Sequence, residues 1–253
     1  MKHIGIVGGM AAVALVAGAA LAASGSRQAQ VASVTGQVES LKSGSETWQP
    51  ASLNQMLSSG DKIRTGEKSG TSLSFDDGST LELAAGSEVA IQTLSGDLPA
   101  QKTQSIVGIQ RGRLTATVTP VPKGSVFEIE TPVVTVAVPP AGADPTLTIM
   151  MNPDGSVQVG STDGTITLTS TGPNQMTAAL SAGDVALLTI NPATGTLQIT
   201  ALAGSFDIIG PDGKPITLAA GDSVSFTGGA ATFVPAPGGL DAPAFGALVE
   251  PVS

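Results

Sequence analysis

Short segments in which apolar and polar residues alternate fill most of the chain after residue 27, and tight turns separate them. Alternation with a period of two is typical of β-strands that bury one face, whereas an amphipathic helix needs a period near 3.6. The turns carry Asp-Gly pairs, in which glycine tolerates a positive φ and aspartate can bond to its own backbone. We therefore expect an all-β fold, preceded by an apolar leader helix. The clearest alternating segments are Thr71–Phe75, Thr80–Leu83, Leu114–Val118, Phe127–Glu130 and Thr165–Leu168.

An internal repeat indicates that such units are stacked on one another. Asp77–Ile91 aligns without gaps to Asp212–Phe226, and seven of the 15 positions are identical. In repeat proteins each unit buries its apolar face on its neighbours. We therefore expect a β-solenoid-like stack of short strands, with a β-sandwich as the alternative because the repeats are imperfect. If the two segments are equivalent units, Gly86 and Gly221 occupy equivalent turns.

The segment Leu57–Gly66 combines two glycines with acidic and basic residues, as a phosphate-binding loop could. Such a loop requires a helix directly after its glycines, because the helix N-terminus faces the phosphate. Here alternating, strand-like sequence follows instead. We expect a turn at Gly60, a short strand over Lys62–Thr65 and a second turn at Gly66.

The first 23 residues have the composition of an export signal. A basic start is followed by the uncharged apolar run Ile4–Ala23, and Ala20–Ala22 matches an A-x-A cleavage site. About 20 apolar residues can also span a bilayer, so an uncleaved N-terminal anchor is the alternative. In both cases we expect the rest of the chain to be periplasmic or extracellular, with membrane contact only through this segment if it is uncleaved.

These patterns divide the chain into four parts. They are a signal peptide or anchor (1–23), a first β domain (31–160), further β repeats that continue the same stack (161–228) and a tail rich in proline, glycine and alanine (229–253). We expect the tail to be extended and loosely packed, with Phe245 and Leu248 as docking points.

Charge and composition exclude several kinds of function. The net charge is −9, and a nucleic-acid partner would require a basic face. Cysteine is absent, which excludes disulfides and thiol chemistry, but a chain of 253 residues can bury a sufficient core without them. Aromatic residues make up only 3%, so the core must be mostly aliphatic. We expect the single tryptophan, Trp48, to anchor that core.

The sequence offers little for catalysis or metal binding. Its only histidine is His3, in the leader, so histidine-based triads and histidine metal ligands are not expected in the exported part. The aspartates of the later turns lack the spacing of calcium loops. Glu128 with Glu130, and Asp76 with Asp77, could form a carboxylate pair for sugar hydrolysis, but a solvated strand face and a turn explain them. We expect a non-enzyme without a cofactor or a metal.

Several motifs resemble, in order and spacing, those of FecR-type domains. They are VTGQVES (34–40), the WQPASL that contains Trp48, LSSGDKIRTG (57–66), TSLSFDDGSTLEL (71–83), VGIQRGRL (107–114) and FEIETPVVTVAV (127–138). The resemblance covers residues 31–159, so the first β domain is FecR-like. It implies an all-β envelope domain with a solenoid-like arrangement. The best-known members relay outer-membrane receptor occupancy to a sigma factor through a cytoplasmic N-terminal domain. Here only residues 1–3 could be cytoplasmic, so we expect a FecR-like protein without the region that contacts the sigma factor.

Three arginines are candidate binding residues. Arg111 and Arg113 flank Gly112, and residues two apart on a strand project from one face. Arg64 lies in another predicted strand of the same domain. Arginine matches the geometry of carboxylate and phosphate groups, so these side chains could form a small anion-binding face. Alternatively they pair with the protein's own carboxylates, since the chain has 20 acidic residues and only 11 basic ones.

The function that these observations favour is that of an exported, non-catalytic FecR-domain protein, a binding or scaffolding module in the cell envelope. Its partner would be an envelope protein or an anionic envelope polymer. The alternative is a component of a cell-surface signalling relay, a FecR-like sensor without its own sigma-factor domain.

Overall fold

The computed structural model describes residues 25–97, 102–140, 144–172 and 174–236. Within these ranges all the regular secondary structure consists of β-strands, which confirms the all-β class. None of the described segments forms a helix of the kind that crosses a membrane. The expected leader helix and cleavage site lie outside the described residues.

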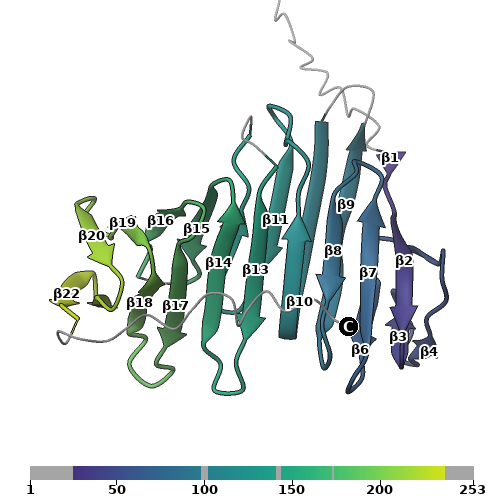
Figure 1. Ribbon diagram of the computed structural model, residues 1–253, viewed down its shortest axis with the longest axis horizontal. Helices are drawn as coiled ribbons and strands as arrows, with labels where there is room; N and C mark the ends of the chain where they lie inside the picture. Colours follow the sequence, from purple (N-terminus) through teal and green to yellow (C-terminus); the bar gives the residue numbers. More distant parts are fainter. Residues whose placement is uncertain (1–24, 98–101, 141–143, 173, 237–253) are drawn as a thin grey trace, which may run out of the picture.

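The strands form two sheets, A and B, which share strand β10. Within each sheet the strands follow one another along the long axis of the molecule (Figure 1). In order, sheet A contains β4 (Gln49–Pro50), β3 (Val38–Leu41), β6 (Lys62–Thr65), β9 (Glu88–Asp97), β10 (Lys102–Thr117), β11 (Val126–Glu130), β12 (Val134–Ala137), β15 (Ile166–Ser170), β16 (Thr177–Leu180), β19 (Ser205–Ile209) and β20 (Pro215–Ala219), with β1 (Gly25–Ser26) also paired to β9. Sheet B contains β5 (Met56–Leu57), β2 (Ala29–Thr35), β7 (Gly70–Phe75), β8 (Thr80–Leu83), β10, β13 (Thr146–Met151), β14 (Val157–Asp163), β17 (Val185–Ile190), β18 (Leu197–Ala203), β21 (Ser223–Thr227) and β22 (Ala230–Val234).

One aliphatic core lies between the two sheets. Alternate residues of the strands are buried, and their side chains form a single cluster to which both sheets contribute. Phe75 of sheet B meets Phe127 of sheet A edge to face, with ring centroids 6.1 Å apart. Trp48 is not part of this core, so the expectation that it anchors the core was wrong. The loop that holds Trp48 runs outside sheet A, where the ring is partly exposed.

The strand pairing does not confirm a solenoid. Apart from β10 with β11, neighbouring strands in these sheets run antiparallel. From β11 onward the chain makes hairpins in the two sheets by turns: β11–β12 in sheet A, β13–β14 in sheet B, β15–β16 in sheet A and β17–β18 in sheet B. The second strand of each hairpin pairs with the first strand of the next hairpin in the same sheet, as in β12–β15, β14–β17, β16–β19 and β18–β21. The result is a curled, two-layered stack that grows by one hairpin at a time.

Strand β10 belongs to both sheets because it bends at Gly112. Residues 102–111 pair with β9 in sheet A, whereas residues 112–117 pair with β8 and β13 in sheet B. Gly112 has a φ of +85°, which only glycine adopts readily, and the pairing with β9 shifts register just before it. A Cβ at Gly112 would lie 2.5 Å from the Cα of Ser87. The crossover therefore depends on glycine both for its conformation and for its close approach to Ser87, the residue before β9.

The turn at Gly60 and the strand Lys62–Thr65 are confirmed, and they show why aspartate follows glycine in this sequence. Gly60 has a φ of +89°, and the backbone N–H of Asp61 donates to the carbonyl of Ser58 (3.0 Å). The buried Asp61 carboxylate then accepts the backbone N–H of Ser58 (2.9 Å) and of Ser43 on a neighbouring segment (2.8 Å). Burial raises the pKa of Asp61, but hydrogen bonds from Lys42, Ser58 and Ser43 outweigh it and the pKa is lowered.

The same turn recurs at the pairs Gly183-Asp184 and Gly221-Asp222. Asp184 accepts the backbone N–H of Ser181 (2.8 Å) and of Ser205 (3.1 Å). Asp222 likewise accepts from Ala219 (2.9 Å) and from Ala236 (2.8 Å). In each case the carboxylate closes its own turn and attaches it to another segment of the stack.

The sequence repeat corresponds to two units that pass from one sheet to the other. β8 to β9 crosses from sheet B to sheet A, and β20 to β21 crosses from A to B. Gly86 (φ +69°) and Gly221 (φ +92°) occupy the matching turns, as the repeat predicts. The stack extends slightly beyond its predicted end at residue 228, because residues 230–234 form β22.

Valine at either of these glycines is expected to lower the free energy of unfolding. At Gly86 nothing lies within 4 Å of an added Cβ, so only the positive φ is unfavourable and we expect a loss of about 1–2 kcal/mol. At Gly221 the Cβ would also lie 2.7 Å from the Cβ of Ala236, and we expect about 1 kcal/mol more. Urea unfolding of both variants measures this. If the free energy of unfolding were unchanged in both variants, the equivalence of the two turns would be contradicted.

Candidate binding groove

Two of the three candidate arginines lie in a row of alternating charge on the outer face of sheet A. Across neighbouring strands Glu39 faces Arg64, Arg64 faces Glu88, and Glu88 faces Arg111. Arg64 bonds to Glu39 through Nε (2.8 Å) and Nη2 (2.7 Å), and Arg111 contacts Glu88 at 3.0 Å. The guanidinium of Arg64 also stacks on Trp48, with Cζ 4.1 Å from the ring centroid. These two arginines are therefore paired with the protein's own carboxylates.

Arg113 lies on the other sheet. The register shift and the bend at Gly112 place Arg113 opposite Met150 in sheet B, while Arg111 stays opposite Glu88 in sheet A. The expectation that Arg111 and Arg113 project from one face therefore fails. It assumed an uninterrupted strand, and the structure does not bring the three arginines together.

A groove of about 590 Å³ runs along the rim of the stack where β10 bends. In Figure 1 this is the lower rim, which also carries the turn between β13 and β14. The charged side chains among the lining residues are Lys68 and Arg113, and both are basic. The lining is completed by Ser69, Ala84, Ala85, Gly112, Met150, Met151, Asn152 and Pro153. The groove thus combines two cations with an apolar wall of methionines.

The backbone around Arg113 is held in place by Ser87. The Arg113 N–H donates to the Ser87 hydroxyl (3.0 Å), and that hydroxyl donates to the Arg113 carbonyl (2.9 Å). The N–H of Ala84, another lining residue, donates to the same carbonyl (3.1 Å). This wall of the groove is therefore preorganised.

Lys68, which the sequence analysis missed, forms the other basic side of the groove. Its φ is +52°, a left-handed conformation in which a non-glycine residue is uncommon. Its side chain is exposed and makes no ion pair within the part of the chain that the structure describes. Most positive-φ positions of the described chain carry glycine, so a lysine at such a position was the available signal.

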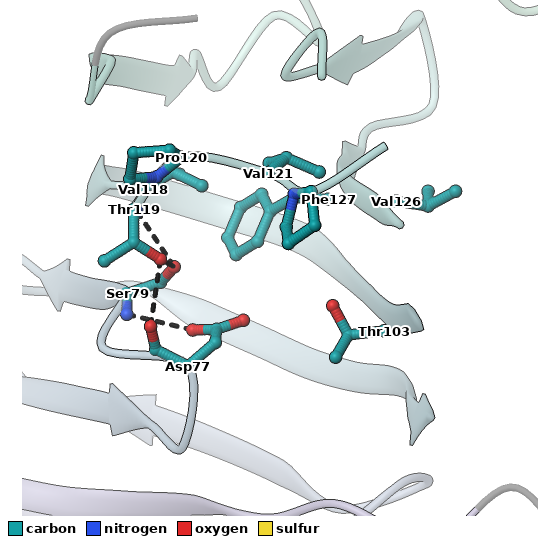
Figure 2. A pocket seen from close by; sticks show the side chains of 10 residues that line it. Asp77, Ser79, Thr103, Val118, Thr119, Pro120, Val121, Val126 and Phe127 are labelled. Atoms are coloured by element: carbon teal, nitrogen blue, oxygen red, sulfur yellow. Dashed lines mark hydrogen bonds between the residues drawn. The ribbon is translucent and has the colours of Figure 1, made fainter. Parts of the chain in front are cut away.

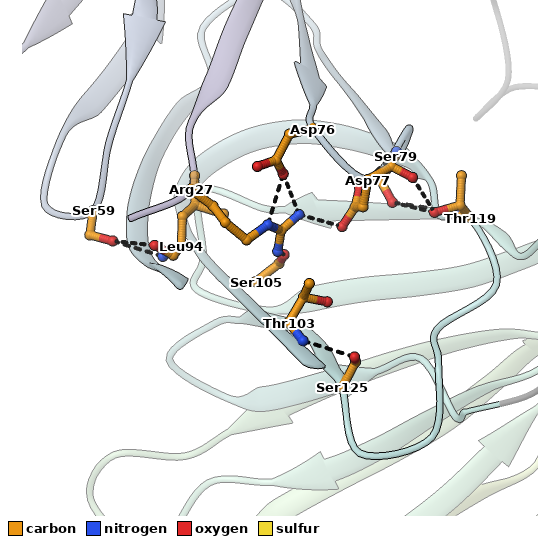
Figure 3. A network of polar contacts seen from close by, with 10 residues as sticks. All are labelled: Arg27, Ser59, Asp76, Asp77, Ser79, Leu94, Thr103, Ser105, Thr119 and Ser125. Carbon is orange, nitrogen blue, oxygen red and sulfur yellow. Dashed lines mark hydrogen bonds and ion pairs between the residues drawn. The ribbon is translucent and has the colours of Figure 1, made fainter. Parts of the chain in front are cut away.

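A second polar centre, around Arg27, was also missed by the sequence analysis. Figure 3 shows the buried Arg27 guanidinium between Asp76 and Asp77 of the β7–β8 turn and Ser105 of β10. The distances are 2.8 Å from Nε to Asp76, 2.7 Å from Nη2 to Asp77 and 2.8 Å from Nη1 to Ser105. The consecutive acids Asp76 and Asp77 were a visible signal. Their partner lies about 50 residues away in sequence. The arrangement fastens the segment between β1 and β2 to both sheets, which is a structural role.

Next to this centre lies a smaller cavity of about 180 Å³ (Figure 2). Its walls are mostly aliphatic and aromatic: Val118, Pro120, Val121, Pro122, Val126 and Phe127. Three of its polar lining residues are engaged within the protein, since Asp77 pairs with Arg27 and the hydroxyls of Ser79 and Thr119 bond to each other at 3.2 Å. This cavity suits a small apolar group rather than a charged one.

The acidic residues do not gather into a metal site within the described ranges. No group of three or more histidine, cysteine, aspartate or glutamate side chains lies close enough to hold a metal ion there. Glu128 and Glu130 alternate with buried residues on β11, as expected for an outward strand face. Asp154 and Asp184 bond to the backbone of their own turns.

Comparison with known proteins identifies part of the chain. Residues 61–166 match the family described as "FecR protein", which confirms the resemblance seen in the sequence motifs. No curated protein matches the chain. Two crystal structures of "a putative anti-sigma factor" from Parabacteroides distasonis, at 1.65 and 2.50 Å resolution, are 15% identical to it with a TM-score of 0.42. Each alignment covers 55% of this chain, which spans 59% of the matched chains.

Proposed function

We propose that this chain, whose residues 61–166 carry the FecR domain, is an exported, non-catalytic binding or scaffolding module of the cell envelope. Its binding site is the groove between Lys68 and Arg113, and its partner presents carboxylate or phosphate groups, as an acidic envelope protein or an anionic envelope polymer does.

The charge of the groove carries this proposal. The chain has a net charge of −9, yet both charged side chains that line the groove are basic. Arg64 and Arg111 lie outside the groove, in the row with Glu39 and Glu88 on sheet A. A concave site with fixed positive charge attracts anions and can hold them by paired hydrogen bonds from arginine.

A non-catalytic role is supported by the state of the polar groups. Within the described ranges, every buried side-chain nitrogen or oxygen has a hydrogen-bond partner. Active sites commonly keep polar groups that are poised for a substrate and shift their pKa values. The pKa values that do shift belong to Asp61, Asp154 and Asp222, which bond to the backbone of turns.

The binding function is tested with poly-L-glutamate and polyphosphate as probes, titrated at low and moderate salt. A Lys68→Gln, Arg113→Gln double variant should bind at least one probe about tenfold more weakly than the native protein, and the remaining binding should depend less on salt. Lys68→Gly should weaken binding without loss of stability, because glycine suits the positive φ at this position.

The matched control is an Arg64→Gln, Arg111→Gln double variant, which removes the same charge from the row on sheet A. It should retain probe binding. Equal loss in both double variants would show an effect of net charge alone and would contradict a groove-specific site. The groove-specific site would also be contradicted if the native protein bound neither probe, or bound both probes equally well at low and moderate salt.

The match to the FecR family favours a second candidate, a component of a cell-surface signalling relay. Deletion of the gene would then change sigma-factor-dependent transcription, which the first function does not require.

A further inference from the structure

A second hollow adjoins the groove on sheet B. Its volume is about 240 Å³, and residues of β2, β7 and β8 line it. The chain leads directly from the groove to this hollow at two places, Ser69–Gly70 and Leu83–Ala84, where one residue lines the groove and its neighbour lines the hollow. The two therefore form one continuous surface across the start of β7 and the end of β8.

The hollow differs from the groove in its chemistry, because most of its polar groups are hydroxyls. The hydroxyls of Ser33 and Ser72 bond to each other at 2.7 Å, and the Thr71 hydroxyl donates to the Ser33 carbonyl (2.6 Å). Whichever serine donates within the first pair, the other keeps its hydroxyl proton for a further bond. The lining residues are Ser33, Thr35, Gly70, Thr71, Ser72, Glu82 and Leu83.

Glu82 places one negative charge beside the two basic residues of the groove. It is exposed, alternates with buried residues on β8 and makes no ion pair within the described ranges. It lies opposite Thr115 of β10, two residues beyond Arg113 on the same face. Glu82 is thus a diagonal neighbour of Arg113, and such neighbours are about 7–8 Å apart.

This charge pattern favours one kind of anion over another. An acidic peptide that seats one carboxylate in the groove brings further carboxylates toward Glu82, and like charges repel. An acidic sugar instead brings hydroxyl groups beside its single carboxylate. Those hydroxyls can donate to Glu82 and exchange bonds with the Ser33–Ser72 pair. The methionines of the groove wall, Met150 and Met151, provide flexible apolar contact for the C–H face of a sugar ring.

We propose that the partner of this surface is an acidic polysaccharide. The carboxylate of one sugar lies between Lys68 and Arg113, and sugar hydroxyls bond to Glu82 and to the serine pair. This inference rests on the proposed function and selects the anionic polymer, rather than an acidic protein, as the occupant of the groove.

Binding of polygalacturonate and poly-L-glutamate with equal numbers of carboxylates tests the proposal at one low salt concentration. The native protein should bind polygalacturonate about tenfold more tightly, because only this probe offers hydroxyls. Glu82→Ala should weaken polygalacturonate binding about fivefold, since the acceptor is lost. The same variant should bind poly-L-glutamate no more weakly than the native protein, because a repulsive charge is removed.

The matched control is Glu128→Ala, which removes the same charge from an outward position on sheet A. It should change the binding of both probes equally. Urea unfolding of the two variants shows whether each is folded, and binding is compared only under conditions in which both are native.

Three results would overturn the proposal. Equal binding of the two probes by the native protein would do so while leaving the groove as a general anion site, and tighter binding of poly-L-glutamate would identify an acidic protein as the partner. Stronger binding of both probes by Glu82→Ala would show that Glu82 only repels anions. If the native protein bound neither of these probes nor polyphosphate, the proposed function itself would fail.

Discussion

Replacing Arg27 by alanine is expected to lower the free energy of unfolding by about 3 kcal/mol at neutral pH, since removing one partner of a buried ion pair typically costs about 3–5 kcal/mol. The Arg27 side chain is 3% exposed and bonds to two carboxylates and a hydroxyl. Its loss would leave Asp76 and Asp77 adjacent and without their cation. The lower end of the range applies because these carboxylates are 33% and 19% exposed and keep some hydration.

The control for this prediction is Arg111→Ala. Arg111 also pairs with a carboxylate, but its side chain is 59% exposed, and exposed pairs contribute about 0–1 kcal/mol. Urea unfolding of both variants at the same salt concentration provides the comparison. Similar losses in the two variants would mean that the Arg27 centre does not fasten the segment between β1 and β2 to the sheets.

Gly112→Ala is expected to lower the free energy of unfolding by about 3 kcal/mol. A positive φ in a non-glycine residue costs about 1–2 kcal/mol, and forced displacement of packed atoms adds about 1–3 kcal/mol. The second contribution arises because the new Cβ would lie 2.5 Å from the backbone of Ser87. Ser87 also holds the backbone of Arg113, so binding at the groove should weaken as well.

Gly183→Ala separates the two contributions to this loss. Gly183 has a φ of +92° but has nothing within 4 Å of an added Cβ, so its replacement should cost only about 1–2 kcal/mol. Both variants are measured by urea unfolding, and anion-probe binding is measured for Gly112→Ala. If Gly112→Ala costs no more than Gly183→Ala, then β10 can cross between the sheets without this close approach to Ser87.

Strand positions could be predicted from sequence because they depend on local patterns. The predicted segment Thr80–Leu83 is β8 itself, and Thr71–Phe75 and Phe127–Glu130 each lie within one residue of the observed strand. Alternation identifies a strand with one buried face, and glycine with aspartate identifies the turn that ends it. Sheet architecture was harder to predict, because the same alternation suits a solenoid and a pair of facing antiparallel sheets.

The candidate site was only partly predictable. Arg113 was named from the sequence and does line the groove, but Lys68 was not, and Arg64 and Arg111 lie elsewhere. The FecR-type motifs identified a domain that the family comparison confirms over residues 61–166. They did not indicate which side chains line the groove, because a motif does not specify how distant strands align.

By itself, the sequence determined the all-β class, the turns and the residues that face inward, since each of these depends on neighbours within a few positions along the chain. Only the tertiary structure decided how charges are paired. Glu39 meets Arg64 across 25 residues and Arg27 meets Asp77 across 50, through strand registers that no local pattern encodes. The bend at Gly112 likewise moved Arg113 to the other sheet, because one residue with positive φ redirects the strand that follows it.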